Sequence, residues 1–509
     1  MIDVTARASE NTSTKISPIA SQDTESSYLL GRSDSAEWRA TWTSELKLLS
    51  TGSFSLIFAN ILQLSLNISS MLVIGPRGKI EFGAVSVATT TANITGFIVF
   101  QGLATSLDTL CAQAWGSGNQ HLVRLHVQRM ISLLGVAGIP IAVLWWTASH
   151  SFPLVLPEPE TAMLAGLYLK ILTAGIPGFV VFEAARRILT AEGTFLPVTG
   201  ILCAGACTNG LLGWILVWVG CLNLFLIVQD TDIFLKRCNL GFIGAPIAVA
   251  TTWTLIPFYL LLYLGVVGKG GIWRYKTSTV LAGWGPMLRL AIPGLVMVEA
   301  EYLAFEVLVI ASAQLSTASL AAQTILATLN SVFWQIPFSI SIAGATRIAQ
   351  YIGARSATSA KTSALVALVL TLICSSTNGT LFFAFRAFWP TIFSDDPDVM
   401  ELVEAALPLI AVMQVFDGLV ACCNGVLRGI GRPSVGGWVN LSSYYVVALP
   451  LSLWSSFVLH WGLKGLWAGV TVALVIVTLA ELSFLMMADW KKSVEDAEWR
   501  NNRPLDQEP

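Results

Sequence analysis

The residues best placed to do chemistry are three glutamates inside a long apolar stretch. Glu299, Glu301 and Glu306 lie within an apolar run that extends from about Pro286 to Ala311. About 20 apolar residues suffice to cross a bilayer, and a charged side chain near its centre costs roughly 2.5–3.5 kcal/mol. A helix that only had to pack would avoid that cost. We therefore predict that these acids face a protein-lined cavity and take up a proton or a cation, the alternative being interfacial snorkelling or a buried hydrogen bond.

The spacing of these acids fits one cavity. Glu299 and Glu306 are seven residues apart and share a helix face. Glu301 lies about 140° around a regular helix from Glu306, so a bend could bring both into one space. Three acids in a low-dielectric space repel one another and favour bound protons. Such a cluster can release a proton when a cation arrives, which is the exchange that an antiporter needs.

A fourth acid lies in another apolar run of the same half of the chain. Asp417 precedes Asn424 and Arg428 by seven and eleven residues, so all three share a face, with Gln414 close by. The alternatives for this aspartate are a structural pair with Arg428 or a hydrogen bond at a helix end. We predict that Asp417 acts with Glu301 in proton or cation coupling.

Two polar stripes at helical spacing are candidates for contacts with a substrate. One runs along residues 323–334 and the other, which has no acid, along residues 60–67. Polar stripes either line a cavity or hold helices together, and an indole can offer its π face to an organic cation. The predicted substrate-binding residues are Glu299, Gln323, Asn330, Trp334, Asn424, Asn60, Gln63 and Asn67.

The remaining acids in apolar runs have simpler expected roles. Asp108 stands where a span meets a loop, so we expect a helix-end or capping role. Glu183 precedes Arg186 and Arg187 by about one turn, which favours an ion pair at the membrane edge. Glu481 stands alone in the last apolar run, and the sequence suggests no function for it.

The composition indicates an integral membrane protein. Of the 509 residues, 54% are hydrophobic and only 12% are charged, against about 25% charged in soluble domains. A net charge of −2 does not indicate the basic surface that binds nucleic acid, so we expect no nucleic acid as a partner. The phosphate-loop and zinc-protease patterns are missing, so we expect neither ATP hydrolysis nor a cofactor.

Apolar runs of spanning length define the expected elements. They fall at about residues 52–75, 84–106, 126–149, 162–185, 197–224, 242–266, 286–311, 320–345, 361–385, 402–425, 436–460 and 465–488. Lys and Arg gather in the two ends of the chain and in every second loop, which predicts that both termini are cytosolic.

An internal repeat predicts the architecture. Residues 106–116 match residues 343–353, and residues 188–193 match residues 426–431, at nearly the same offset; a weaker match relates 241–244 to 462–465. Six spans in each half give two bundles of like orientation, the arrangement of parallel transporter repeats. We thus predict an all-α integral membrane fold with twelve transmembrane helices in two pseudo-symmetric six-helix bundles.

The expected divisions follow from these spans. They are a disordered cytosolic tail at 1–50, an N-lobe at 51–266, a cytosolic linker at 267–285, a C-lobe at 286–488 and a cytosolic C-terminal tail at 489–509.

Several segments together form a specific pattern, namely Leu107–Gly116 with Gln128-Arg129, Leu320–Ile325, Val426–Arg432, Asn440, Tyr444-Tyr445, Leu449-Pro450 and Gly465–Trp467. With these segments the chain resembles the multidrug and toxic compound extrusion (MATE) transporters, in their eukaryotic, fungal-like branch. The resemblance covers residues 45–488. It implies a two-lobed, twelve-helix fold and secondary active export of organic, often cationic, compounds in exchange for H⁺ or Na⁺.

The resemblance also implies roles for individual acids. Glu301 and Glu306 match the family's two acids in the seventh span, which are implicated in substrate and proton coupling, and Asp417 matches its acid in the tenth span. Tyr302-Leu303 stands where two aromatics are usual, and Glu299 is an addition to the pattern. The first span has no acid, so we place coupling in the C-lobe.

The function predicted from the sequence is export of small organic compounds by antiport with H⁺, or less favourably Na⁺, through alternating access of two lobes. A flippase for a lipid-linked headgroup would want a basic central cavity, and a membrane-embedded transferase would want a long catalytic loop. The major facilitator superfamily has twelve spans as well, but its basic loop after the second span is poorly matched at 116–121. We expect a monomer in the plasma membrane or the vacuolar membrane.

Overall fold

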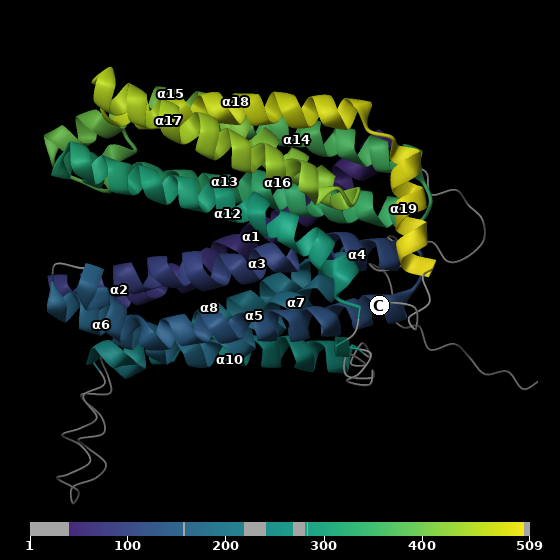
Figure 1. Cartoon of the computed structure of the whole chain (residues 1–509), viewed down its shortest axis with the longest axis horizontal. Helices are drawn as coiled ribbons and strands as arrows, with labels where there is room; N and C mark the ends of the chain where they lie inside the picture. The colour runs from purple at the N-terminus through teal and green to yellow at the C-terminus, as the bar shows by residue number, and fades with distance from the viewer. Residues whose placement is uncertain (1–39, 156–157, 218–240, 268–279, 282, 503–509) are drawn as a thin grey trace, which may run out of the picture. The chain divides into compact units, whose positions relative to one another are not determined.

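The computed structural model describes residues 40–155, 158–217, 241–267, 280–281 and 283–502. This part of the chain is almost entirely helical (Figure 1). A helix satisfies every backbone polar group within the segment itself, which is what a chain in lipid requires. Eleven helical segments in the described ranges are long and apolar enough to cross a membrane. The helix Gly285–Leu315 has the length as well, but it carries the three glutamates and Arg289. It completes the predicted set of twelve.

The first bundle contains the helices of the first half of the chain. They are α1 (Trp42–Ile74), α2 (Lys79–Ala92), η1 (Asn93–Phe97), α3 (Ile98–Ala104), α4 (Ser106–Gly116), α5 (Gln120–Val155), α6 (Pro159–Leu172), η2 (Thr173–Gly175), α7 (Ile176–Glu192), α8 (Leu196–Val217) and α10 (Gly241–Val266).

The second bundle contains the helices of the second half. They are α12 (Gly285–Leu315), α13 (Thr317–Gly353), α14 (Ala357–Ala384), η4 (Pro390–Ile392), α15 (Pro397–Gly429), α16 (Pro433–Ser442), η5 (Ser443–Ala448), α17 (Leu449–Leu453), η6 (Trp454–Val458) and α18 (Leu463–Met487), followed by α19 (Trp490–Asn502). In Figure 1 the helices labelled α2, α5, α6, α7, α8 and α10, of the first bundle, lie below those labelled α12 to α18, of the second.

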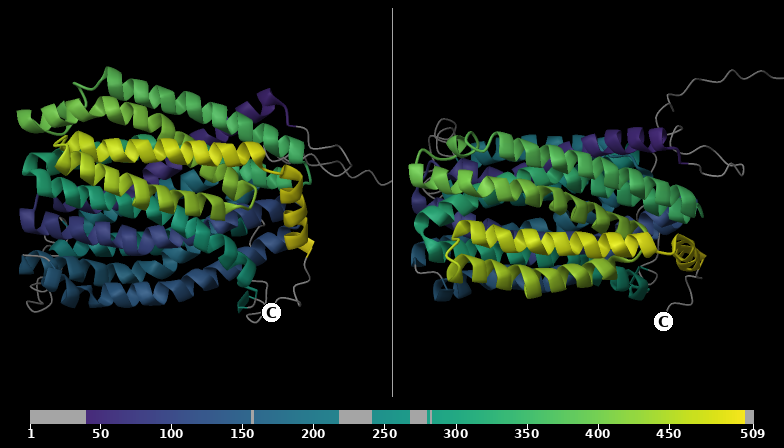
Figure 2. Two further views of the ribbon diagram at one scale, coloured as in Figure 1. Left: turned by 45° about the horizontal axis from the view of Figure 1, so that its top comes forward. Right: turned by 90° about the horizontal axis from the view of Figure 1, so that it is seen from above.

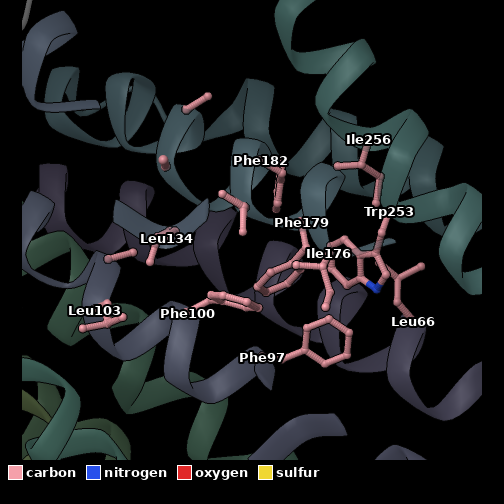
Figure 3. Close-up of a cluster of buried hydrophobic side chains, with 14 of the residues drawn as sticks. Leu66, Phe97, Phe100, Leu103, Leu134, Ile176, Phe179, Phe182, Trp253 and Ile256 are labelled. Atoms are coloured by element: carbon pink, nitrogen blue, oxygen red, sulfur yellow. The ribbon is translucent and has the colours of Figure 1, made fainter. Parts of the chain in front are cut away.

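An aromatic cluster holds the first bundle together (Figure 3). Phe179 lies with its ring centroid 4.7 Å from that of Phe97 and 4.7 Å from that of Trp253, so one cluster joins η1, α7 and α10. Phe100 and Phe182 extend it, and both are fully buried. Aromatic pairs at such distances contribute about 0.5–1.5 kcal/mol each beyond their area burial. The cluster therefore fixes α7, the helix that carries Glu183 and the two arginines.

The two bundles repeat one another in backbone detail. The helix α4 is followed by Gly118 at φ 79°, and α13 is followed at the matching position by Arg355 at φ 62°. After α7 and α15, Gly193 at φ 81° matches Gly431 at φ 79°. Left-handed residues of this kind end helices. The predicted repeat, with six helices in each half, is thus confirmed.

The bundles meet at one end of the molecule through reciprocal contacts. Gln113 of α4 donates from Nε2 to the carbonyl oxygen of Gly429 at 3.1 Å, and Gln350 of α13 donates to the carbonyl oxygen of Ala191 at 2.8 Å. These two pairs are equivalent under the repeat. We call this end, formed by the C-terminal ends of α4, α7, α13 and α15, the closed end.

The ends of the chain are more helical than predicted. The tail was expected to reach residue 50, but α1 begins at Trp42, after a capping box made by Thr41 and Ser44. Glu45 of this first turn is buried and pairs with Arg347 of α13 at 2.8 Å. Polar residues at 42–50 suggested a tail, but Ser44 takes part in the helix cap and Glu45 in the ion pair. The predicted linker, 267–285, lies mostly outside the described residues.

The helix α19 lies within the predicted C-terminal tail and runs across the closed end (Figure 1 and Figure 2). Arg500 donates to Oε1 of Gln113 in the first bundle at 2.8 Å. Glu498 pairs with Arg355 of the second bundle at 2.6 Å. This helix therefore contacts both bundles where they meet.

Candidate functional site

A cavity of about 150 Å³ lies between the two bundles. Its lining is polar on the side of the first bundle and partly aromatic on the side of the second. The lining residues from the first bundle include Asn60, Gln63, Gln101, Thr105, Asp108, Arg186 and Arg187. Those from the second include Met297, Glu301, Tyr302, Trp334, Gln335, Phe338, Asn424 and Arg428.

Ion pairs form the floor of the cavity next to the closed end. Asp108 of α4 pairs with Arg187 of α7, and its other oxygen lies 3.7 Å from Nε of Arg428, which comes from α15 of the second bundle. Oε1 of Glu183 accepts from Arg186 at 2.7 Å and from Arg187 at 3.0 Å. Each of these side chains is at most 14% exposed. We call these five residues the charged floor.

Three acids of the second bundle lie near one another, and one of them lines the cavity. Glu301 of α12 is half-buried and lines the cavity. It lies close enough to Asp417 of α15 and Glu481 of α18 for ionised forms of these groups to repel it. Asp417 is 2% exposed and Glu481 is fully buried. Oδ2 of Asp417 and both oxygens of Glu481 accept no hydrogen bond from any described residue.

Aromatic side chains line the same cavity as Glu301. The rings of Trp334 and Phe338 are stacked, with centroids 4.3 Å apart and an interplanar angle of 18°, and both line the cavity. Tyr302 adds a third ring from α12. Nε1 of Trp334 and Oδ1 of Asn424 are buried without a hydrogen-bond partner among the described residues. A carboxylate and stacked rings in the lining of one cavity, with spare polar atoms, can hold an organic cation.

The comparison with protein families decides what this pair of bundles is. The MatE family model matches residues 55–215 and 293–454, one match in each bundle. The chain belongs to the MatE family. It is therefore a membrane-embedded transporter and not an enzyme, and the predicted family resemblance is confirmed.

Individual relatives agree with this assignment. The MatE chain is 35% identical over 454 residues to an uncharacterized transporter of Schizosaccharomyces pombe, which covers 89% of this chain and 82% of the relative. It is 30% identical to multidrug and toxin extrusion protein 1 of Homo sapiens, over 86% of this chain and 74% of the relative. The crystal structure of the eukaryotic MATE transporter AtDTX14 matches with a TM-score of 0.82 and 28% identity, covering 90% of this chain and 99% of that one.

The structure brings five of the predicted site residues into the cavity of this MatE protein. Glu301, Trp334 and Asn424 line it from the second bundle, and Asn60 and Gln63 from the first. Asn60 donates to Oγ of Ser339 at 3.0 Å, a bond between the bundles. Asn67 lies on α1, but its side chain is outside the described part of the structure.

Other predicted site residues lie away from the cavity. Gln323 accepts from Nε1 of Trp467 at 2.8 Å, and Asn330 accepts from Gln414, so both join helices within the second bundle. The half-buried Glu299 and Glu306 do not line the cavity. Their assignment to substrate binding or to coupling stays a prediction.

Arg428 pairs with Asp108 and not with Asp417, and Asp417 lies well inside α15 and not at a helix end, so it has neither of the simple roles considered for it. Asp108 is likewise more than a helix cap, since it pairs with Arg187 and borders the cavity. The predicted pairing of Glu183 with the two arginines is confirmed.

Sequence reasoning missed Arg186, Arg187 and Arg428 as cavity residues. The available signal was their position in apolar runs, where arginine is rare unless it lines an interior. Within the described ranges, no group of three His, Cys, Asp or Glu side chains is placed to hold a metal ion.

Proposed function

We propose that this transporter exports flat organic cations in exchange for protons. The observation that carries the proposal is the position of Glu301, a carboxylate that lines the same cavity as the stacked rings of Trp334 and Phe338. A carboxylate supplies the counter-charge for a cation, and the rings supply a large apolar face. The same carboxylate can instead hold a proton, and then it no longer attracts a cation.

The acids behind Glu301 support competition between proton and substrate. Asp417 and Glu481 are buried, and Oδ2 of Asp417 and both oxygens of Glu481 have no hydrogen-bond donor among the described residues. Ionised carboxylates close together in a low-dielectric interior repel one another, so at least one of the group tends to hold a proton. A cation arriving at Glu301 makes ionisation of the group less costly and favours proton release. Proton uptake reverses this and weakens the hold on the cation.

The two matched bundles support alternating access. In the present conformation they meet at the closed end, through Gln113, Gln350 and the charged floor. Lys and Arg gather in the ends of the chain and in every second loop, which favours a cytosolic position for both termini and for the closed end. On this orientation the structure is closed toward the cytosol. Export then requires a second conformation in which the contacts at the closed end separate.

The test is ethidium transport in proteoliposomes with imposed gradients. An opposing proton gradient is expected to drive ethidium accumulation, whereas a Na⁺ gradient of the same size is expected to drive none. Glu301→Gln and Asp417→Asn should each abolish the response to the proton gradient. Glu306→Gln is measured as well, because Glu306 is a predicted coupling residue that does not line the cavity in this conformation. Unchanged gradient-driven transport in both Glu301→Gln and Asp417→Asn would refute the proposed coupling site.

The compartment is tested separately. We propose the plasma membrane or the vacuolar membrane, and density-gradient fractionation of cells that produce the tagged full chain distinguishes the two.

A further inference from the structure

We infer that Glu481 carries a second exchangeable proton and releases it to the cytosol when the closed end opens. The release is driven by Arg428, which leaves Asp108 of the first bundle and pairs with Glu481 of its own bundle. The inference rests on the proposed function for the exchange of protons and for the cytosolic position of the closed end. The role of Glu481 is distinct from that of Glu301, which lines the cavity.

Glu481 is a buried acid close to the closed end. It lies on α18, which ends at Met487, so it stands about 9 Å from the end of that helix at 1.5 Å per residue. Its side chain is fully buried, and neither of its oxygens accepts a hydrogen bond from a described residue. An ionised carboxylate without donors is costly in a buried site. We therefore expect Glu481 to hold a proton in this conformation.

Titratable and charged groups of three other elements lie within electrostatic range of Glu481. They are Cys423 and Arg428 of α15, Glu301 of α12 and Tyr444 of η5. Asp417 of α15 also acts on the last two. A hydrogen bond from Thr478 to the carbonyl oxygen of Phe416, at 3.4 Å, joins α18 to α15 about one turn away. Of these groups only Arg428 carries a positive charge, so it is the one that can stabilise an ionised Glu481.

Arg428 is held at the closed end by a partner from the other bundle. Its Nε lies 3.7 Å from Oδ2 of Asp108, and the acids that act on its charge are Asp108 and Glu481. It also donates to neutral atoms, Oγ of Ser341 at 3.3 Å and Sδ of Met297 at 3.9 Å. Arg428 donates no hydrogen bond to Glu481 in this conformation, because both oxygens of that acid lack a donor among the described residues.

Opening of the closed end separates the members of the charged floor unevenly. Its two acids and two arginines from the first bundle stay together and balance in charge. Arg428 moves with the second bundle and loses Asp108. A buried cation without a counter-charge is costly. Glu481 is the acid of the second bundle that acts on Arg428, so it can take the place of Asp108.

This change of partner releases a proton. Glu481 gives its proton to water at the opened cytosolic side, and its carboxylate then pairs with Arg428. The step transfers one proton from a carboxylic acid to water and changes no other bond. When the bundles close again, Arg428 returns to Asp108, and the carboxylate of Glu481 takes up a proton because it has lost its cation. That proton comes from the cavity, which Glu301 lines within electrostatic range of Glu481.

A structural role for Glu481, as a neutral buried side chain, is the competing explanation. It predicts that Glu481→Gln leaves the pH dependence of opening unchanged, because glutamine has a similar shape and no charge. The role in proton release predicts a loss of that dependence. If opening releases a proton, the open conformation binds fewer protons than the closed one and is favoured as the pH rises.

The ratio of open to closed molecules is measured without substrate in nanodiscs, from the distance between spin labels at Gln120 and Thr358 in a background without the eight native cysteines. Both positions are exposed at the closed end. The ratio in this background is expected to rise with pH by up to about tenfold per pH unit for each proton released. Glu481→Gln should lower this dependence by one proton and favour the closed conformation. Glu401→Gln, at an exposed position of α15, is the matched control and should keep the full dependence.

Arg428→Gln provides a second test of the same pair. It should lose the dependence that Glu481→Gln loses, and the double variant should lose no more than either single variant, because the two residues act as one unit. Three results would overturn the inference: a ratio that does not change with pH in the unsubstituted background, full pH dependence in Glu481→Gln, or full pH dependence in Arg428→Gln.

Failure of the proposed function looks different. It would appear as ethidium transport that does not respond to the proton gradient, or as unchanged gradient-driven transport in Glu301→Gln and Asp417→Asn. The ratio of open to closed molecules is measured at equilibrium without ethidium and without a gradient, so neither of those results changes it.

Discussion

The closed end makes a sharp prediction about Gly116. This glycine ends α4, and a Cβ placed on it would lie closer than 3.0 Å to the backbone carbonyl of Gln350 in α13. Gly353 of α13 stands in the same relation to Gln113 of α4. These contacts exist only while the bundles touch at the closed end. Gly116→Ala should therefore destabilise this conformation relative to one in which the ends of α4 and α13 have separated.

The free-energy cost of Gly116→Ala follows from the atoms that the added methyl group would contact. The obstacle is backbone, which cannot rotate away like a flexible side chain, so the helices must move. Overpacking of a well-packed contact costs roughly 1–3 kcal/mol. A free energy of about 1–3 kcal/mol corresponds to a shift of roughly 5- to 150-fold in a conformational equilibrium.

The shift is measured by the distance between spin labels at Gln120 and Thr358, in a background without the eight native cysteines. Both positions are exposed at the closed end, one in each bundle. Gly116→Ala is expected to add or enlarge a long-distance component. Gly200→Ala is the matched control, because nothing lies within 4 Å of a Cβ at that position. A distance distribution identical to wild type in Gly116→Ala would refute the reasoning.

Two further predictions concern the buried ion pairs and the helix α19, which runs across the closed end. Asp108→Asn removes a buried counter-charge shared by Arg187 and Arg428, and breaking a buried ion pair costs about 3–5 kcal/mol, so it should lower the midpoint of thermal unfolding in detergent. Glu404→Gln is the control, because it removes only an exposed ion pair worth about 0–1 kcal/mol. An equal decrease of the unfolding midpoint in both variants would contradict the role given to Asp108. Replacing Arg500 and Asn501 by alanine removes the hydrogen bonds from α19 to Gln113 and should enlarge the long-distance component of the same spin-label pair; no change would show that α19 does not stabilise the closed end.

The repeat was readable in the sequence because it rests on local backbone geometry. Gly193 and Gly431 both take positive φ after a helix, and such a position favours glycine whatever surrounds it. Gly116 and Gly353 match for a different reason, namely that each packs against a carbonyl of the other bundle. The sequence showed that these glycines correspond, but not that they touch the opposite bundle.

The extents of the first and last helices could not be read in the same way. Residues 42–50 are polar enough to resemble a tail, yet Glu45 is buried against Arg347, some three hundred residues away in the chain. The helix α19 is equally polar, and its partners Gln113 and Arg355 come from different bundles. Hydropathy describes a residue and its neighbours in the chain, so it misses polar segments whose partners are distant.

What the sequence determined by itself was the fold and the presence of unusual charge in the membrane, because the cost of an acid or an arginine in lipid depends only on residue type. Which charges meet was decided by the tertiary structure. Glu301 faces the cavity while Glu299 and Glu306 do not, and Arg428 turns toward Asp108 of the other bundle instead of Asp417 on its own helix. Rotation about a helix axis and the crossing of two bundles set these partnerships, and neither is encoded in the spacing of residues along one helix.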